Sequence, residues 1–461
     1  MSHISRRTFL RNAAAVSAGF AGLHRFTKCT ENIQIQQLGY GPLQPVSNGW
    51  LDLPAGFNAQ IIARTGQTMA DSLLRPGQPD GMAAFTATDD KTILICNHEL
   101  ESAHGPFGPN LERLSQVPPH LIYDRGHNKP AMGGTTTLVY DTKKKRVDNQ
   151  YLSLAGTRRN CAGGPTPWNS WLSCEEDVAV IDNDWQQDHG YVFEVPASSA
   201  AQLTEPVPLK SMGRFVHEAV AVDPGTGIVY QTEDRNDGCI YRYVPNEYGH
   251  LASGGRLQAL AIREQRAADL RNWPDGAVTP FPVGVPTAVG WIDLDDIQSP
   301  ANDLRKRAFT AGAAQFARGE GMWFGRQSVF FACTNGGTAK LGQIFRYTPS
   351  PYEATAAETT KPGALELFLE SNDDAISKNA DNLTVAPWGD LLICEDCSGV
   401  DRLIGITPRG ETYLLARNAR NESELAGCCF SPDGSTLFVN IQDPGITFAI
   451  TGPWRSQHFA I

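Results

Sequence analysis

Short apolar stretches separated by tight turns recur along most of the chain. In the clearest copy, His217 and Glu218 open an apolar stretch, Asp223-Pro224-Gly225 forms a turn, and a second apolar stretch ends at Thr232-Glu233-Asp234. Residues such as Pro, Asp and Gly at these positions suit tight connections between antiparallel strands. Each copy of the pattern therefore predicts a β-hairpin whose polar residues lie at one end.

Six copies of this pattern can be recognised. They occupy residues 80–99, 162–177, 217–234, 320–335, 381–396 and 424–442. The two ends of an antiparallel hairpin lie side by side, so the opening and closing polar residues of each copy meet. Such hairpins match the inner strands of an all-β, six-bladed β-propeller, where those ends converge on a central channel. Several β-sandwiches are the alternative, but a sandwich gives no reason for polar residues at the same end of every hairpin.

The longest interruption lies between the third and fourth hairpins, at residues 249–315. Leu257 to Leu270 and Pro300 to Ala317 have the period and composition of helices. We therefore predict a partly helical insertion near the mouth of the channel.

The N-terminus has the pattern of an export signal. Arg6-Arg7 is followed by Phe9-Leu10 and by a mildly apolar run over residues 13–23. Paired arginines before a short apolar run resemble the twin-arginine signal. We expect residues 1–30 to be this signal and residues 31–461 to form a single propeller domain. The protein would then be periplasmic or secreted, and the twin-arginine export machinery would be its partner.

Composition and charge narrow the function classes. The 44 Gly and 30 Pro residues, with only 19% charged residues, argue against a helical bundle or a disordered chain. A formal net charge of −11 disfavours nucleic acid as the main partner. No later stretch of about 18 apolar residues follows the signal, so no stable membrane anchor is expected. We expect a monomer that acts on small molecules.

A ring of carboxylates is predicted around the channel. Its members are Glu99, Glu175, Glu176, Glu218, Glu233, Asp234, Glu320, Asp381, Glu395, Asp396 and Glu424. So many carboxylates in one small space cannot all ionise without compensation, which bound cations supply. Oxygen ligands suit Ca²⁺ and the hard ion Fe³⁺. Cys174 adds a candidate thiolate, which favours a transition metal, although a small buried core residue explains it equally well.

Arg318-Gly319-Glu320 is the second informative pattern. In a strand, residues two positions apart project to the same face, which would place the Arg318 guanidinium beside the Glu320 carboxylate. A guanidinium near bound cations is well suited to clamp a phosphate through two oxygens. A simple Arg–Glu ion pair is the alternative.

Several motifs together resemble the PhoX-type alkaline phosphatases. They are Asn97-His98-Glu99, the segments 161–176 and 213–220, Thr232-Glu233-Asp234, Arg318-Gly319-Glu320-Gly321 and Asp381-Asn382-Leu383. The resemblance implies a six-bladed propeller with Fe³⁺ and Ca²⁺ in its channel that hydrolyses phosphomonoesters. Many members of that family have Arg-Pro-Glu where this chain has Arg-Gly-Glu.

The resemblance also implies roles for individual residues. Cys174, Glu233 and Glu320 are expected to bind iron, and Arg318 is expected to bind the phosphate. Further iron or calcium ligands are expected at Glu99, Glu175, Glu176, Glu218, Asp381 and Glu395. On this basis Arg318, Glu320 and Cys174 form the predicted catalytic set.

Two other functions fit the same repeat. A calcium-dependent propeller lactonase needs a few carboxylates and has no use for Cys174. A metal-stabilised binding propeller without catalysis needs only the fold, because a fold does not fix a function. Iron together with calcium would favour the phosphatase, and calcium alone the lactonase.

Overall fold

The computed structural model describes residues 38–87, 90–101, 103–274 and 279–455. The signal predicted for residues 1–30 lies outside them. From Pro42 onward the described residues form one compact unit, and nearly all of its regular structure is β-strand. The described part of the chain has one α-helix, α2 (Leu304–Ala311). The short 3-10 turns are η1 (Leu114–Gln116), η2 (Pro119–Leu121), η3 (Lys210–Met212), η4 (Leu251–Ser253) and η5 (Ala356–Thr360).

Antiparallel sheets make up the unit, and three of them have three or four strands. The first contains β4 (Pro79–Thr86), β5 (Lys91–His98), β6 (Gly133–Asp141) and β7 (Arg146–Thr157). The second contains β8 (Asn160–Pro165), β9 (Ser170–Glu175) and β10 (Val192–Pro196). The last in chain order contains β24 (Leu425–Phe430), β25 (Thr436–Ile441), β26 (Ile446–Thr451) and β3 (Asn58–Arg64).

Two larger sheets lie between these. One runs in the order β11 (His217–Val222), β12 (Val229–Glu233), β13 (Ile240–Pro245), β14 (Gly255–Ile262), β15 (Thr287–Asp293), β19 (Ala364–Glu370), β18 (Gln343–Thr348), β17 (Ser328–Cys333) and β16 (Gly319–Gly325). The other runs in the order β1 (Leu43–Pro45), β2 (Leu51–Pro54), β23 (Thr412–Asn418), β22 (Arg402–Ile406), β21 (Leu391–Glu395) and β20 (Ala380–Val385).

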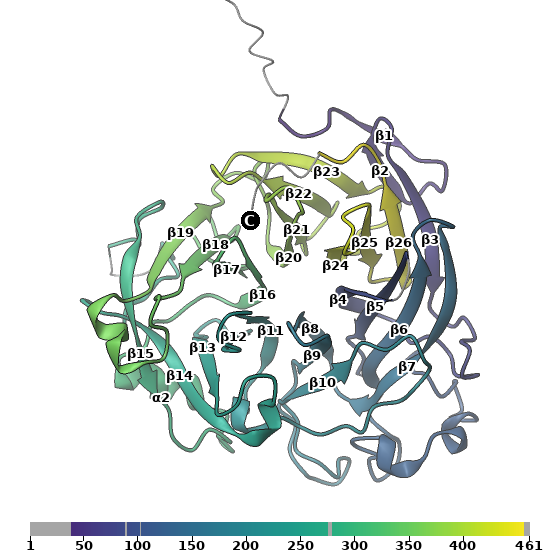
Figure 1. The fold of residues 1–461 in the computed structure, drawn as a ribbon, viewed down its shortest axis with the longest axis horizontal. Coiled ribbons are helices and arrows are strands. Elements are labelled where there is room, and N and C mark those ends of the chain that lie inside the picture. The colour runs from purple at the N-terminus through teal and green to yellow at the C-terminus, as the bar shows by residue number, and fades with distance from the viewer. Residues whose placement is uncertain (1–37, 88–89, 102, 275–278, 456–461) are drawn as a thin grey trace, which may run out of the picture. The chain divides into compact units, whose positions relative to one another are not determined.

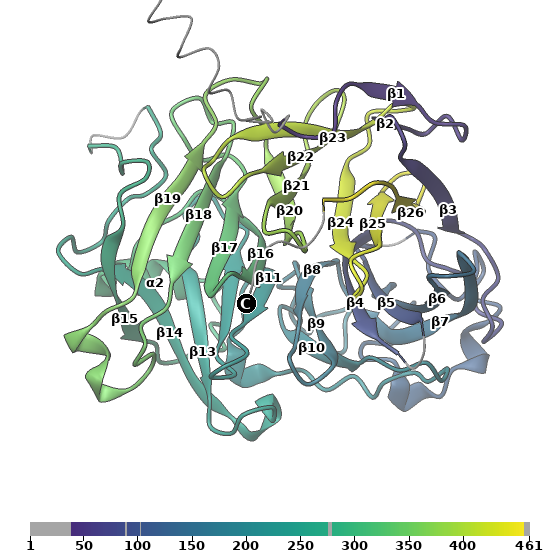
Figure 2. The same ribbon diagram turned by 45° about the horizontal axis from the view of Figure 1, so that its top comes forward.

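The sheets stand around a common centre (Figures 1 and 2). The strands nearest this centre, which we call the inner strands, are β4, β8, β11, β16, β20 and β24. The early strand β3 pairs with the last strand β26, so segments near the two ends of the described chain meet in one sheet. The predicted all-β, propeller-like architecture is confirmed, and the count of six blades stays a prediction.

The predicted insertion between the third and fourth hairpins is only partly helical. Pro300 to Ala317 does contain α2. Leu257 to Leu270 is not a helix, because its first part forms β14, which pairs with β13 and β15. The run from Leu257 to Leu260 is buried on both faces of the sheet. A short apolar run of this kind has no alternation, so its period cannot separate a buried strand from a buried helix.

Each inner strand carries a register shift near its start. Two of its residues lie opposite one residue of the next strand, which is the arrangement of a β-bulge. The shifts follow Pro79, Asn160, His217, Gly319, Ala380 and Ala426. A bulge re-aims the side chain that it contains and bends the strand. The repeat seen in the sequence therefore corresponds to a repeated bulge at the central end of every inner strand.

Glycines let neighbouring inner strands approach each other at the bulges. A Cβ atom on Gly427, whose φ is +63°, would lie 2.1 Å from the backbone oxygen of Asp80. A Cβ atom on Gly321 would lie 2.6 Å from the backbone oxygen of Asp381. These distances are too short for any side chain, so the inner strands pack backbone to backbone here.

A buried ionic network fastens the loops beside β9. His189 Nε2 lies 3.1 Å from Asp124 Oδ2, and its Nδ1 lies 2.6 Å from Glu175 Oε1. The three side chains have no solvent exposure. Burial alone would lower the pKa of His189, but the charge of Glu175 and the hydrogen bonds that His189 donates to both carboxylates outweigh it and raise the pKa to about 9. A pKa of about 9 favours the protonated imidazole at neutral pH, held between the side chains of Asp124 and Glu175.

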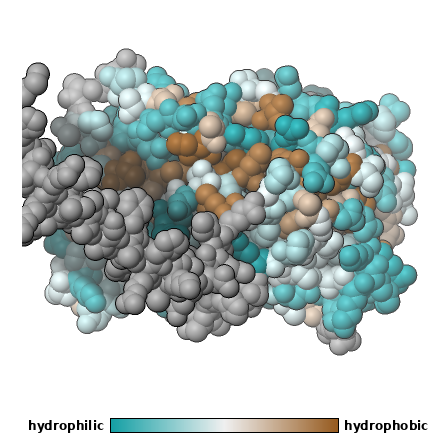
Figure 3. Space-filling model, turned by 90° about the horizontal axis from the view of Figure 1, so that it is seen from above, coloured by the Kyte–Doolittle hydropathy of each residue, from teal (hydrophilic) through white to brown (hydrophobic). Residues whose placement is uncertain are grey.

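The exposed apolar residues are dispersed over the surface. The face shown in Figure 3 mixes hydrophilic and apolar side chains. The large exposed apolar residues of the described chain, such as Ile181, Val207, Val283 and Val400, come from separate loops. Among the described residues, no helix has both the length and the apolar character needed to cross a bilayer.

Gly427→Ala should destabilise the protein strongly. Gly66 provides a matched control, because its φ is +78° and a Cβ atom there would meet nothing within 4 Å. Gly66→Ala should cost about 1–2 kcal/mol from the left-handed backbone alone. Gly427→Ala should cost roughly 1–3 kcal/mol more, from the clash with the neighbouring strand. Equal losses in denaturant unfolding would show that the inner strands are not packed this closely.

His189→Gln should destabilise the protein in a pH-dependent way. Folding raises the pKa of His189 from 6.5 to about 9, so protonated His189 stabilises the folded state. This contribution is fully present below about pH 6.5 and is lost as the pH rises through about 9. The difference in unfolding free energy between wild type and variant should therefore shrink on the order of 3 kcal/mol from pH about 6 to about 10.

The matched control is His98→Gln. His98 is also buried, but burial lowers its pKa to about 3, so it is neutral throughout this range. Only the unfolded form of His98 binds a proton near pH 6, so the stability difference between wild type and the His98 variant in denaturant unfolding should change by less than about 1 kcal/mol, and in the opposite direction. A pH-independent loss in the His189 variant would contradict the charged network.

Candidate metal centre

Five of the six inner strands carry a potential metal ligand at their bulges, at the common centre of the sheets, which we call the channel. These bulge residues are Asp80, Cys161, Glu218, Glu320 and Asp381. All five are buried, with at most 7% of the residue surface exposed. The sixth inner strand, β24, has Gly427 and Cys428 at its bulge and supplies no carboxylate from it. Glu424, which directly precedes β24, lies close to the cluster, and burial followed by the charges of Asp381 and Asp80 raises its pKa well above the usual range.

A second set of side chains comes from the residues that follow the second strand of each hairpin. We call these the closing residues: Glu99, Glu176, Asp234, Thr334, Asp396 and Gln442. Each closing N–H donates to a carbonyl in front of the neighbouring inner strand. The acceptors are Gln78, Arg159, Val216, Arg318, Asn379 and Glu424, at 2.9–3.3 Å. This repeated hydrogen bond holds every closing residue beside the bulge of its own hairpin.

The two sets form one continuous cluster of metal-ligand type. Ligand atoms lie within 4.8 Å of one another in the groups Asp80–Glu99–Cys161, Cys161–Glu176–Glu218 and Glu218–Glu320–Asp381. Cys161 and Glu218 each belong to two groups, so the groups run into one another. Three neighbouring ligand groups can hold more than one cation.

Five of the predicted ligands belong to these groups, and Glu320 is one of them. The other four come from different strands and loops. They are Glu99, Glu176, Glu218 and Asp381. Asp80 and Cys161 complete the groups and were not among the predicted ligands. The signal for Asp80 was available, because it opens the first hairpin in the same way as Glu218 opens the third.

Three predicted ligands point away from the channel into the sheets. Glu175 accepts from His189 and from the N–H of Gly190 at 2.8 Å. Glu233 accepts from Tyr241 Oη at 2.7 Å. Glu395 accepts two hydrogen bonds from Arg402, at 2.6 and 2.7 Å.

A simple geometric rule explains these three positions. Each of Glu175, Glu233 and Glu395 directly precedes an acidic closing residue, and adjacent residues of an extended chain project to opposite sides. In each acidic pair, therefore, the second carboxylate faces the centre of the sheets and the first makes its hydrogen bonds within the sheet.

Cys174 does not join the carboxylates. It is fully buried in an apolar cluster with Leu172, Val192 and Phe215. The residue opposite a bulge keeps regular strand pairing, and Cys174 takes this position by pairing with Val192. Its thiol therefore points into the core.

Cys161, and not Cys174, places its sulfur atom among the carboxylates. Its Sγ lies 3.1 Å from Glu218 Oε1 and 3.7 Å from Asp80 Oδ2. Sequence reasoning started the second hairpin at Ala162, one residue too late. The alignment of bulges, which only the strand register reveals, puts Cys161 level with Asp80 and Glu218.

The protein alone does not supply enough positive charge to balance the carboxylates of this cluster. Burial, followed by repulsion between neighbouring carboxylates, raises the pKa of Asp80, Glu176, Glu218 and Glu320 well above the usual range. The same causes raise the pKa of Asp381 to about 7. Asp80 Oδ1 and Glu218 Oε2 are buried and accept no hydrogen bond from the described residues. Orphaned buried oxygens next to a thiol are the donor set that a bound cation would satisfy.

Arg318 lies at the edge of this cluster. Its Nε and Nη2 donate to the two oxygens of Asp234 at 2.7 and 2.8 Å, and Nη2 lies 3.0 Å from Glu320 Oε1. The predicted proximity of Arg318 and Glu320 is therefore present, with Asp234 as an additional anchor. The side chain of Arg318 is 39% exposed, so a ligand entering the channel can reach it.

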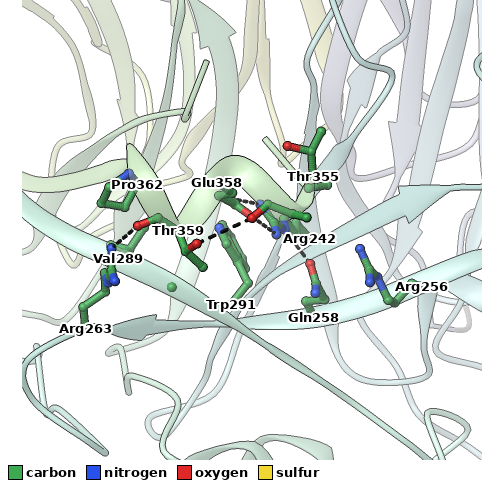
Figure 4. A pocket seen from close by; sticks show the side chains of 13 residues that line it. Arg242, Arg256, Gln258, Arg263, Val289, Trp291, Thr355, Glu358, Thr359 and Pro362 are labelled. Atoms are coloured by element: carbon green, nitrogen blue, oxygen red, sulfur yellow. Dashed lines mark hydrogen bonds and ion pairs between the residues drawn. The ribbon is translucent and has the colours of Figure 1, made fainter. Parts of the chain in front are cut away.

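A cavity of about 420 Å³ lies elsewhere, against β13, β14, β15 and η5 (Figure 4). Its charged groups already satisfy one another. Arg242 donates to Gln258 at 2.7 Å and to both oxygens of Glu358 at 2.6 and 2.8 Å. The guanidinium also stacks over Trp291. This cavity has none of the uncompensated donors or acceptors that distinguish the channel.

Comparison with solved structures supports the fold. The chain is similar to Pseudomonas fluorescens PhoX in complex with vanadate, a transition state analogue, with a TM-score of 0.67 and 17% identity over 90% of this chain and 98% of that one. A Xanthomonas campestris gluconolactonase is similar at a TM-score of 0.41 and 13% identity over 91% of this chain and 99% of that one. Comparison with curated proteins gives no significant match.

The family is shown by the sequence itself. The profile described as "Alkaline phosphatase PhoX" matches residues 38–445, which is most of the chain and includes every bulge and closing residue. The resemblance read from the separate motifs is thereby confirmed, and the chain belongs to the PhoX family of alkaline phosphatases.

Proposed function

We propose that this protein hydrolyses phosphomonoesters to inorganic phosphate in its central channel, with iron and calcium as cofactors. One observation carries the proposal: the buried, overlapping ligand groups from Asp80 to Asp381, with a thiol among them and Arg318 beside them. Buried carboxylates in this number need cations, and cations with an arginine suit a phosphate.

The donor atoms suggest how the cations would be shared. Glu218, Glu320 and Asp381 offer only oxygen, which suits the hard ions Ca²⁺ and Fe³⁺. The two groups that contain Cys161 add sulfur, which favours iron over calcium. Bound cations of this kind neutralise the charge of a phosphoryl group and activate water as a nucleophile.

The protein's own residues would position the substrate. Arg318 can bind two phosphate oxygens at once and stabilise the negative charge that they carry during transfer. Asp234 fixes its guanidinium through two hydrogen bonds, so little reorganisation is needed when the substrate arrives.

Export completes the proposal. The paired arginines at the N-terminus would direct the protein through the twin-arginine machinery to the periplasm or the medium. The protein would act there as a monomer on small phosphoesters.

Cys161→Ser should reduce the iron content of the purified protein, whereas Cys174→Ser should not. Serine removes the sulfur donor in both variants, but only Cys161 lies against Glu218 and Asp80. We expect the Cys161 variant to lose about tenfold or more of its bound iron, and the Cys174 variant to keep its iron. Elemental analysis of both proteins checks this, and iron loss from the Cys174 variant alone would reverse the assignment. Calcium without iron in the wild type would favour the lactonase alternative.

Arg318→Ala and Glu320→Gln should each reduce kcat/KM for p-nitrophenyl phosphate by about 100-fold or more. Arg346→Ala and Glu366→Gln are matched controls, because these residues pair with each other on the outer strands β18 and β19. Both controls should retain wild-type activity. Full activity in both channel variants would refute the proposed site.

A further inference from the structure

We propose that Arg159 is a second phosphate-binding residue of the channel and the counterpart of Arg318. This inference rests on the proposed phosphatase function. The sequence motifs point to Arg318 alone, and the equivalence of the two arginines becomes visible only when the bulges are aligned.

Arg159 and Arg318 occupy the same position in two different sheets. Each lies two residues before a bulge residue, Cys161 for Arg159 and Glu320 for Arg318. Both have a left-handed backbone, with φ of 43° and 48°. The carbonyl of Arg159 accepts from the N–H of Glu176 at 2.9 Å, and that of Arg318 accepts from the N–H of Thr334 at 3.0 Å. A left-handed conformation is uncommon for a non-glycine residue, so its recurrence marks a repeated structural position.

No other repeat places a cation at this position. The equivalent residues, all of them described, are Gln78, Val216, Asn379 and Glu424. Gln78 and Asn379 share the left-handed backbone, with φ of 42° and 50°, but carry neutral amides. The backbone conformation therefore does not require a positive side chain. The arginines at positions 159 and 318 must be explained by the charges around them.

A chain of carboxylates joins the two arginines along one side of the channel. Arg159 Nη2 lies 2.7 Å from Glu176 Oε2, Glu176 is hydrogen-bonded to Asp234, and Asp234 binds Arg318. Glu176 and Asp234 are almost fully covered, with side-chain exposures of 10% and 8%. The side chains of Arg159 and Arg318 are 32% and 39% exposed, so both are accessible to a ligand from solvent.

Arg159 also keeps a free donor. Its Nη1 and Nη2 contact Glu101, Glu99 and Glu176 at 2.6–3.1 Å. Its Nε is buried and donates to no described group. A buried guanidinium N–H without a partner is costly, and an anion or a water molecule held by one would satisfy it.

Charge explains why one arginine is insufficient. A phosphomonoester carries close to two negative charges at alkaline pH, and the channel wall is itself lined with carboxylates. The proposed cations balance part of the phosphate charge, and Arg318 already pairs with Asp234 and Glu320. A second guanidinium on the other side of the Glu176–Asp234 pair would balance the remaining charge and fix the orientation of the phosphate.

The test compares Arg159→Ala and Arg159→Lys with Arg158→Ala. The Arg158→Ala substitution removes the same charge one residue away. The Arg158 side chain pairs with Asp177 and stacks on Trp185. Inorganic phosphate is the probe, and its binding to the metal-loaded proteins is measured by calorimetry. We expect Arg159→Ala to weaken phosphate binding by about 10- to 100-fold with unchanged metal content. Arg159→Lys should recover part of the affinity, and Arg158→Ala should match wild type.

The outcomes separate this inference from the proposed function. Unchanged phosphate binding in Arg159→Ala, or weaker binding accompanied by loss of metal, would overturn the inference and leave Arg159 as a support for Glu99 and Glu176. Turnover of p-nitrophenyl phosphate by the wild type tests the function independently. Phosphate binding that depends on Arg159 in a protein without turnover would sustain the inference and refute the function. A wild type that binds no phosphate would overturn both.

Discussion

Repulsion between buried carboxylates is the constraint on which the structure of the channel depends. Asp80, Glu218 and Glu320 are nearly inaccessible to water, and burial together with the charges of neighbouring carboxylates raises the pKa of each. A fold that tolerates this arrangement must hold the side chains by its backbone, because the side chains themselves push apart. The close packing of inner strands at Gly427 and Gly321 provides that backbone rigidity.

The repeated bulge has two structural effects. It directs one side chain of each inner strand to the centre, and it brings the following N–H of the hairpin's second strand onto a fixed carbonyl. Adjacent acidic residues therefore lie in different surroundings, according to which side of the strand they project from. Glu176 faces the channel, while Glu175, one residue earlier, is neutralised by His189 inside the sheet. Uncompensated charge is thus confined to the channel, where cations and substrate phosphate can balance it.

The hairpins, their polar ends and the acidic character of the channel were predictable from the sequence, because turn residues and apolar stretches are local signals. Glu99, Glu218, Glu320 and Asp381, which the sequence predicted as ligands, do lie in the groups that could hold a cation. Cys161 and Asp80 were missed and Cys174 was chosen instead, since a bulge shifts the facing residue by one position. The strand β14 was taken for a helix because an apolar run buried on both faces carries no alternation.

The sequence alone determined the family, the all-β class and the conclusion that carboxylates converge on one place. These follow from the order of residue types along the chain, which local physical chemistry reads directly. Only the tertiary structure decided which of two adjacent carboxylates faces the channel, which cysteine lies among them, and that Arg159 is equivalent to Arg318. Those outcomes depend on strand register and on bulges, and register is set by pairing between segments far apart in the chain.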